Sequence, residues 1–378
     1  MLIVNPNNRI HNSLAAVETP VWASLIASYL DADILDAEAG DLTLEQTEEA
    51  IRNTRYKDII IVVMGNNPSV SSTPKMPIAE ALAERISDLN VSMTGLHPVA
   101  VGSKWPVIKK PFEGFPTMPW DKLPMNLYRA HNWHCLDGSP RTPYASIYTS
   151  LGCPFDCYYC NIHTLYSGRK IQFRPIPDIF KEVEILAKYN VKNIKIWDEL
   201  FTLHEKRVIT ICSGLKDYDL NIWAYARLDT VTLKMLKAMK GAGINWLAYG
   251  FESVSDKKFT SAAEDAIKAT RDSGINIIAN FMFGLPDTTR EDDDVPSFEF
   301  AKKHLFEFVN FYDAKPYPGS QWYEDVKPDI PWEDYTQYGN GSKFRDKAFK
   351  EYFTNPEYLK MVKTKFGRQG IIRIKALT

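Results

Sequence analysis

The chain has 378 residues, of which 45% are hydrophobic and 24% are charged. These proportions exclude a wholly disordered, collagen-like or coiled-coil chain, and the length suggests two domains. Because 45 basic and 47 acidic side chains give a net charge of −2, we expect no nucleic-acid partner. The longest strongly apolar run, 59–64, is far shorter than the roughly 20 residues that span a bilayer, so we expect a cytoplasmic protein with no membrane segment.

Short β-branched runs alternate with helical patterns through the first 100 residues. The pattern predicts strands at 2–4, 34–35, 58–64 and 91–95, and helices at 21–29, 42–55 and 78–86. Such alternation is typical of a parallel sheet with helices on both faces, whose ligands bind at the carboxyl ends of the strands. We therefore predict a Rossmann-like domain over 1–100, with the polar loop 66–73 at its ligand-binding edge.

Residues 101–143 lose this periodicity and are rich in proline and tryptophan, which predicts an ordered linker. A second alternating series occupies 144–320. It predicts strands at 145–149, 193–197, 221–225, 246–249, 276–283 and 308–312, and helices at 176–189, 205–216, 231–242, 260–273 and 296–304. A full eight-fold (β/α) barrel needs about 250 residues. The expected fold class is therefore α/β, with the Rossmann-like domain, a partial (β/α)6 barrel and a C-terminal extension, 321–378, that closes the barrel.

Three cysteines fall within eight residues, directly after the first predicted barrel strand. Cys153, Cys157 and Cys160 have the thiolate chemistry that a four-iron four-sulfur (4Fe-4S) cluster requires, and three ligands would leave one iron open. A zinc site completed by His163 is the alternative. No second cysteine pair supports zinc, because Cys135 and Cys212 are isolated.

This CxxxCxxC motif, with Tyr159 before its last cysteine and a half-barrel after it, resembles the radical S-adenosylmethionine (radical SAM) enzymes. The resemblance implies that the three cysteines hold the cluster and that S-adenosylmethionine chelates the open iron. It also implies that residues at the strand ends bind S-adenosylmethionine. The candidates are Tyr159, Asp198, Glu199, Tyr225, Arg227, Gly250, Glu252 and Asn280. Arg227 could instead pair with Asp229 or Glu252, and Asp198 or Glu199 could serve a helix dipole.

The N-terminal domain resembles the cobalamin-binding domain that precedes the barrel in a large radical SAM subfamily. The resemblance implies that polar residues of the 66–73 loop hold cobalamin, namely Asn67, Ser69, Ser71, Ser72 and Thr73. No Asp-x-His-x-x-Gly sequence is present to ligate cobalt. The domain looks shortened, because a fifth strand and a further helix are not predicted after 91–95. The hydroxyl residues could instead cap the 78–86 helix.

The subfamily resemblance implies a methyltransferase that acts on an unactivated carbon of a small molecule through a 5′-deoxyadenosyl radical. Its electron would come from a donor such as flavodoxin or ferredoxin. Candidate catalytic residues are His131, His134 and Tyr312, since a linker histidine facing the barrel could accept a proton. The alternatives are non-methylating radical chemistry, with or without cobalamin, and a non-catalytic iron–sulfur or zinc protein.

Overall fold

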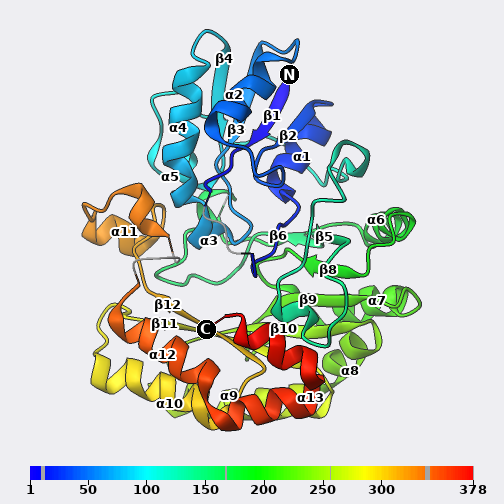
Figure 1. Cartoon of the computed structure of the whole chain (residues 1–378), viewed down its shortest axis with the longest axis vertical. Helices are drawn as coiled ribbons and strands as arrows, with labels where there is room; N and C mark the ends of the chain where they lie inside the picture. Colours follow the sequence, from blue (N-terminus) through cyan, green and yellow to red (C-terminus); the bar gives the residue numbers. More distant parts are fainter. Residues whose placement is uncertain (10–12, 167, 256, 337–340, 378) are drawn as a thin grey trace.

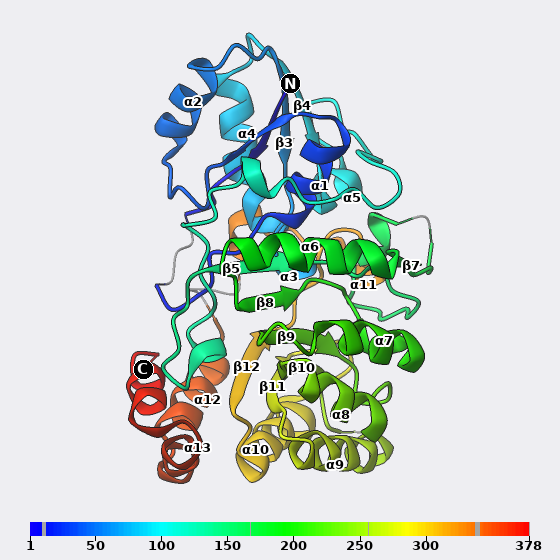
Figure 2. The same ribbon diagram turned by 90° about the vertical axis from the view of Figure 1, so that its right-hand side faces the viewer.

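Figure 1 shows the computed structural model of the chain, which describes residues 1–9, 13–166, 168–255, 257–336 and 341–377. Two parallel sheets lie one after the other along the long axis of the molecule, and the helices cover them from outside (Figures 1 and 2). None of the helices in the described part of the chain has the length and apolar character that a membrane span requires.

The first sheet confirms the predicted Rossmann-like arrangement. Its four strands are parallel and run in the order β2-β1-β3-β4. The strands are β1 (Leu2–Asn5), β2 (Asp33–Asp36), β3 (Asp58–Val62) and β4 (Asn90–Thr94). The helices are α1 (Val21–Tyr29), α2 (Leu44–Arg52), α3 (Pro68–Ser71), α4 (Met76–Arg85) and α5 (Leu96–Val101).

Side chains alternate between the two faces of this sheet, and each face has its own core. Val4 and Ile61 pack in a cluster with residues of α2 and α4. Ile3 and Ile60 point the other way and pack in a cluster that contains α1 and extends through the linker into the barrel. The N-terminal sheet and the barrel therefore share one continuous core.

The linker also completes the edge of the first sheet. Among the described residues no fifth strand pairs with β4. A further helix does follow β4, namely α5, which corrects the expectation that the domain lacks one. In place of a fifth strand, the amide of Met93 donates to the carbonyl of Pro106, and the amide of Ile108 donates to the carbonyl of Met93, both at 2.8 Å. These bonds satisfy part of the exposed edge of β4.

The second sheet is the predicted half-barrel, with six parallel strands in the order β12-β11-β10-β9-β8-β5. The strands are β5 (Tyr144–Ile147), β8 (Asn193–Ile196), β9 (Asn221–Ala226), β10 (Ile244–Glu252), β11 (Asn276–Phe283) and β12 (Phe308–Asp313). The helices between them are α6 (Ile176–Lys188), α7 (Glu205–Leu215), α8 (Leu233–Gly241), α9 (Lys257–Asp272) and α10 (Val295–His304). A small antiparallel pair that the sequence did not predict, β6 (Ser150–Leu151) and β7 (Gln172–Phe173), flanks the cysteine loop.

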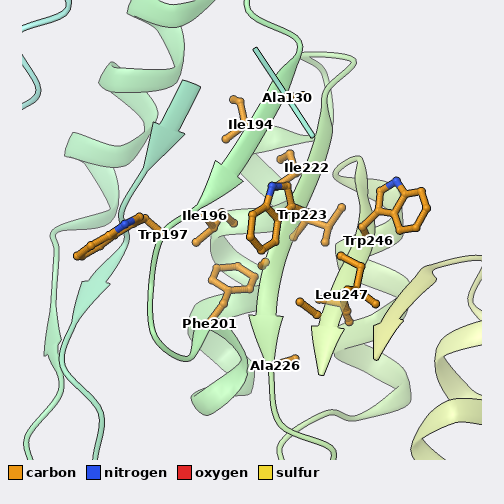
Figure 3. Close-up of a cluster of buried hydrophobic side chains, with 14 of the residues drawn as sticks. Ala130, Ile194, Ile196, Trp197, Phe201, Ile222, Trp223, Ala226, Trp246 and Leu247 are labelled. Carbon is orange, nitrogen blue, oxygen red and sulfur yellow. The ribbon is translucent and has the colours of Figure 1, made fainter. Parts of the chain in front are cut away.

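Aromatic residues of the linker fill part of the barrel interior. The ring centroid of Trp133 lies 5.4 Å from those of Trp223 and Trp246 and 5.7 Å from that of Phe308. Figure 3 shows part of this core, to which Ala130 of the linker also belongs. The linker is therefore a structural part of the barrel, which explains its high aromatic content.

The C-terminal extension packs on the last strand and on the linker. It contains α11 (Gln321–Val326), α12 (Lys343–Thr354) and α13 (Pro356–Lys375). The Tyr352 hydroxyl donates to the Phe306 carbonyl at 2.7 Å, and Phe366 stacks on Trp246 with centroids 5.8 Å apart. Helix α12 agrees with the helical pattern that the sequence shows around 344–353. Helix α13 is not indicated by the sequence, and in it Gly367 has a φ of 68° and interrupts the helical pattern.

Candidate active site

The three cysteines lie on one loop at the carboxyl end of the barrel's first strand. Gly152 begins this loop with a φ of 88°, and a Cβ there would lie 2.4 Å from the carbonyl oxygen of Lys170, so only glycine fits. Cys153, Cys157 and Cys160 are all partly exposed. Burial raises the pKa of each thiol, that of Cys160 to about 12, so a metal must displace protons to bind here.

The three thiols and His163 are the donors that this part of the chain offers to a metal. The Nε2 atom of His163, the proposed fourth zinc ligand, lies 2.6 Å from the carbonyl oxygen of Phe155. Within the described residues, no three His, Cys, Asp or Glu side chains converge as the ligands of one metal ion would. A four-iron cluster offers each thiolate its own iron, so its ligands need not converge on one point.

Arg227, at the carboxyl end of β9, lies against the cysteine loop. Its guanidinium carbon is 3.9 Å from the ring centroid of Phe155. Two of its nitrogens each donate to the Asp229 carboxylate at 2.9 Å. The structure thus combines both interpretations of the sequence, because Arg227 pairs with Asp229 and still faces the loop that would hold the cluster.

Glu252 lies close to the same loop because of an irregularity in β10. The register of β10 shifts between Gly250 and Glu252, and Glu252 has a φ of 56°. A Cβ at Gly250 would lie 2.4 Å from a carboxylate oxygen of Glu252, so glycine at 250 makes room for this side chain. Burial raises the pKa of Glu252 to about 7, although Arg227 and the Tyr159 hydroxyl favour its ionised form.

The two acidic residues after β8 have different environments. Asp198 is 1% exposed and accepts bonds of 2.6 Å from the Thr149 amide, the Thr149 hydroxyl and the Ser150 hydroxyl. Its carboxylate therefore holds the start of the cysteine loop, whereas its role toward S-adenosylmethionine stays a prediction. Glu199 is half-buried and, within the described part of the chain, accepts from the Gly152 amide and the Tyr166 hydroxyl, at 3.1 and 3.2 Å. Glu199 remains a candidate.

Three further candidates line the inner face of the barrel. Asn280 donates to the Tyr249 carbonyl at 3.0 Å and accepts from the Asn310 amide at 2.9 Å. Tyr225 lies on β9, with its ring 5.7 Å from the ammonium of Lys195. Tyr312 lies near the carboxyl end of β12, one strand beyond Asn280.

The two linker histidines lie in different surroundings. His131 stacks on Trp133 and its Nδ1 accepts from the Ala16 amide at 3.1 Å. His134 is 2% exposed, and neither of its ring nitrogens has a hydrogen-bond partner among the described residues. Burial lowers the pKa of His134 to about 3. His134 is therefore a core residue, which corrects its candidacy as a proton acceptor.

Most hydroxyls of the 66–73 loop bond within the N-terminal domain. Ser71 and Ser72 donate to the carbonyls of Asn67 and Pro68 at 2.6 Å, and Thr73 lies 3.2 Å from His97. This corrects the expectation that all of these hydroxyls face a ligand. They do not cap α4 either, since its N-cap, Lys75, makes no side-chain capping bond.

Ser69 alone among these hydroxyls contacts the barrel, with its Oγ 3.9 Å from the Sγ of Cys160. Asn66, at the start of the same loop, lines a small cleft together with Trp22 and Trp197.

The sequence interpretation missed a buried ion pair between the two sheets. Lys195 of β8 and Glu18 of the β1–α1 connection are 2.7 Å apart, and their side chains are only 2% and 5% exposed. A lysine in the middle of the predicted strand 193–197 was the available signal, since a buried lysine needs a partner.

Comparisons with known proteins agree with this architecture. Residues 147–296 match the model of the radical SAM superfamily. A protein of Pyrococcus horikoshii described as an uncharacterized methyltransferase is 30% identical over 289 residues, which are 69% of this chain and 60% of that protein. Bacteriochlorophyllide d C-8(2)-methyltransferase of Chlorobaculum tepidum is 29% identical over 54% of this chain and 49% of its own length. The chain thus matches about half to three fifths of the length of these relatives.

Among solved structures, the fold is similar to that of the radical S-adenosylmethionine methyltransferase TsrM from Kitasatospora setae, with cobalamin and a [4Fe-4S] cluster bound. The TM-score is 0.66 at 15% identity, and the match covers 86% of this chain and 77% of TsrM. The cobalamin-dependent radical enzyme OxsB matches 95% of this chain and 56% of its own, with a TM-score of 0.55 at 14% identity. At these identities the likeness concerns the fold, and it includes the N-terminal sheet.

Proposed function

Because residues 147–296 form a radical SAM domain, we propose that the protein is a radical SAM methyltransferase of the cobalamin-dependent type that acts on a carbon of a small molecule. One observation carries the proposal. Three cysteines on a single loop face Arg227 and lie at the same end of the barrel as the half-buried carboxylates Glu199 and Glu252. Carboxyl-end loops are where barrels of this kind place their active sites.

Each group of this site has a distinct role in the proposal. Cys153, Cys157 and Cys160 hold the cluster, whose open iron, when loaded, supplies one-electron cleavage of S-adenosylmethionine. Glu199 accepts hydrogen bonds from the amino group of S-adenosylmethionine, and Arg227 binds its carboxylate. Gly250 leaves space for Glu252 near the adenosine. Tyr312 and Asn310 line the remaining wall.

The methyl-transfer part of the proposal is supported by the relatives. Several matched proteins are named as methyltransferases, including a hopanoid C-3 methylase of Methylococcus capsulatus that is 24% identical over 51% of this chain. Radical chemistry without cobalamin is a second candidate, favoured by the bonds that Ser71 and Ser72 donate to carbonyls of their own segment instead of to a ligand.

The remaining partners are also proposals. The substrate is a small molecule, and a reduced flavodoxin or ferredoxin supplies the electron. The cytoplasm suits such a protein, because its thiols must stay reduced until the cluster forms.

Metal analysis and product detection test the proposal. Protein purified without oxygen from cells supplied with cobalamin should contain about four irons and one cobalt per chain, and reduction with S-adenosylmethionine should yield 5′-deoxyadenosine. Cys157→Ala should abolish that product, whereas the matched control Cys212→Ala, which changes a buried cysteine outside the loop, should retain it. Iron with no cobalt would contradict the cobalamin-dependent type and support radical chemistry without cobalamin. Stoichiometric zinc, or no 5′-deoxyadenosine, would refute it.

A further inference from the structure

A buried cation joins the N-terminal domain to the inner wall of the barrel. The Lys195 ammonium donates to a carboxylate oxygen of Glu18 at 2.7 Å and to the Asn66 carbonyl at 2.8 Å. Its nitrogen also lies 4.8 Å from the ring centroid of Trp223. Lys195 comes from the middle of β8, whereas Glu18 and Asn66 follow β1 and β3 of the other sheet. One ammonium therefore connects three chain segments across the domain boundary.

The surroundings of Glu18 hold this ion pair in place. Its second carboxylate oxygen accepts from the Tyr144 hydroxyl at 3.3 Å and lies 3.4 Å from Nε2 of His131. Since Nδ1 of His131 accepts a backbone N–H, Nε2 is the ring nitrogen left to donate, and it faces Glu18. Removing one member of such a pair leaves an unpaired buried charge, which is strongly destabilising.

The Asn66 carbonyl lies at the start of the loop that carries Ser69. This loop is braced internally, because the Gly65 amide donates to the Ser72 hydroxyl at 3.0 Å and the Ser71 hydroxyl donates to the Asn67 carbonyl at 2.6 Å. Because these bonds hold the loop rigid, fixing Asn66 at its start also fixes the position of Ser69 at its tip. At that tip, the Ser69 Oγ lies 3.9 Å from the Cys160 Sγ.

We infer that Lys195 is a positioning residue that, through Asn66, holds the Ser69 hydroxyl against the Cys160 sulfur, so that the N-terminal domain sets the reduction potential of the cluster. This inference rests on the proposed function for the cluster itself. A cluster-bound Cys160 is a thiolate, so Ser69 must be the donor. Hydrogen bonds to cluster sulfurs tune the potential. A donor stabilises the more negative, reduced cluster, so losing it should make the potential more negative.

Two sets of variants separate positioning from general stability. The double variant Glu18→Gln with Lys195→Met removes the ion pair without leaving an unpaired charge, and Ser69→Ala removes only the donor. The matched control is Glu182→Gln with Arg174→Met, which removes a fully buried ion pair in the barrel that does not touch the 66–73 loop.

The first readout, hydrogen exchange of the full chain, does not depend on the cluster. In the Glu18/Lys195 variant, amides 65–71 should exchange at least about tenfold faster than in the wild type, because local opening becomes easier. The control pair should leave that segment unchanged. Unchanged exchange in the Glu18/Lys195 variant would overturn the role of Lys195, even if the wild type loads no cluster and the proposed function fails.

The second readout is the midpoint potential of the reconstituted cluster, followed by electron paramagnetic resonance. Ser69→Ala and the Glu18/Lys195 variant should both shift it to more negative values, and combining them should add nothing beyond Ser69→Ala. The control pair should not shift it. No shift in Ser69→Ala would overturn the hydrogen bond, and a shift in Ser69→Ala alone would overturn positioning by Lys195. Cluster loading without methyl transfer would contradict only the proposed function.

Discussion

Buried His134 makes the stability of this protein sensitive to acid. Burial lowers its pKa from 6.5 to about 3, so the unfolded chain binds a proton between these values and the folded protein does not. Proton binding by the unfolded chain therefore lowers the free energy of unfolding as the pH falls below about 6.5. Above that pH this loss is absent. From the two pKa values, the loss reaches about 1.4 kcal/mol at about pH 5.5.

His134→Phe should remove this contribution, because phenylalanine keeps the ring and cannot take up a proton. The difference in unfolding free energy between about pH 7.5 and 5.5 should shrink by about 1.4 kcal/mol relative to the wild type. For a chain of 378 residues this corresponds to about 2 °C in melting temperature. Burial also lowers the pKa of His97 to about 4. Part of the pH dependence of the unfolding free energy therefore remains in the variant.

Urea titrations at both pH values measure this effect. Any change in packing caused by the substitution is independent of pH and cancels in the comparison. His204→Gln, at an exposed position, serves as the control and should keep the wild-type slope. An identical pH slope in His134→Phe and the wild type would refute the reasoning, and loss of 5′-deoxyadenosine formation in this variant would restore His134 as a catalytic candidate.

Three further substitutions probe the site. Asp198→Ala removes the acceptor that holds Thr149 and should lower the free energy of unfolding by about 3 kcal/mol. The urea midpoint and the iron loading should both fall, and normal loading would contradict the anchoring role. Gly250→Ala should displace the Glu252 carboxylate and weaken S-adenosylmethionine binding about tenfold by calorimetry, a loss of about 1.4 kcal/mol, with little change in stability. Trp133→Ala should lower the free energy of unfolding by about 3–5 kcal/mol if the linker fills the barrel, whereas a loss below about 1 kcal/mol would show that it does not.

The order of strands and helices was predictable because both sheets are parallel and buried. Runs such as 58–64 and 276–283 contain enough β-branched and aromatic residues to identify strands without homologues, and α1 was predicted with the bounds that the structure has. Helix α13 was not, since its apolar residues are diluted by lysines and interrupted by Gly367. The short pair β6 and β7 was missed because two-residue strands carry no periodicity.

The site was predictable only where the chemistry is local in sequence. Three cysteines in eight residues are enough to identify a metal-binding loop, because their spacing alone brings the thiols together. The distinction between Asp198 and Glu199 depends instead on which of them meets Thr149 and Ser150 from another strand. The same limit explains why the sequence treated His131 and His134 alike, although the fold buries only one of them completely.

The contacts of Lys195 with two segments of the other sheet show that the two domains do not act as separate units. Parallel α/β units place their functional loops at the carboxyl ends of strands, and here the β1 and β3 loops of the first sheet reach the interior of the second. The apolar core crosses the same boundary, because Trp22 of α1 lies 6.5 Å from Trp197 at the end of β8. The barrel without its N-terminal domain would expose this core and leave the Lys195 charge without its carboxylate. The boundary near residue 100 therefore separates two folding patterns, while the site proposed for catalysis belongs to both.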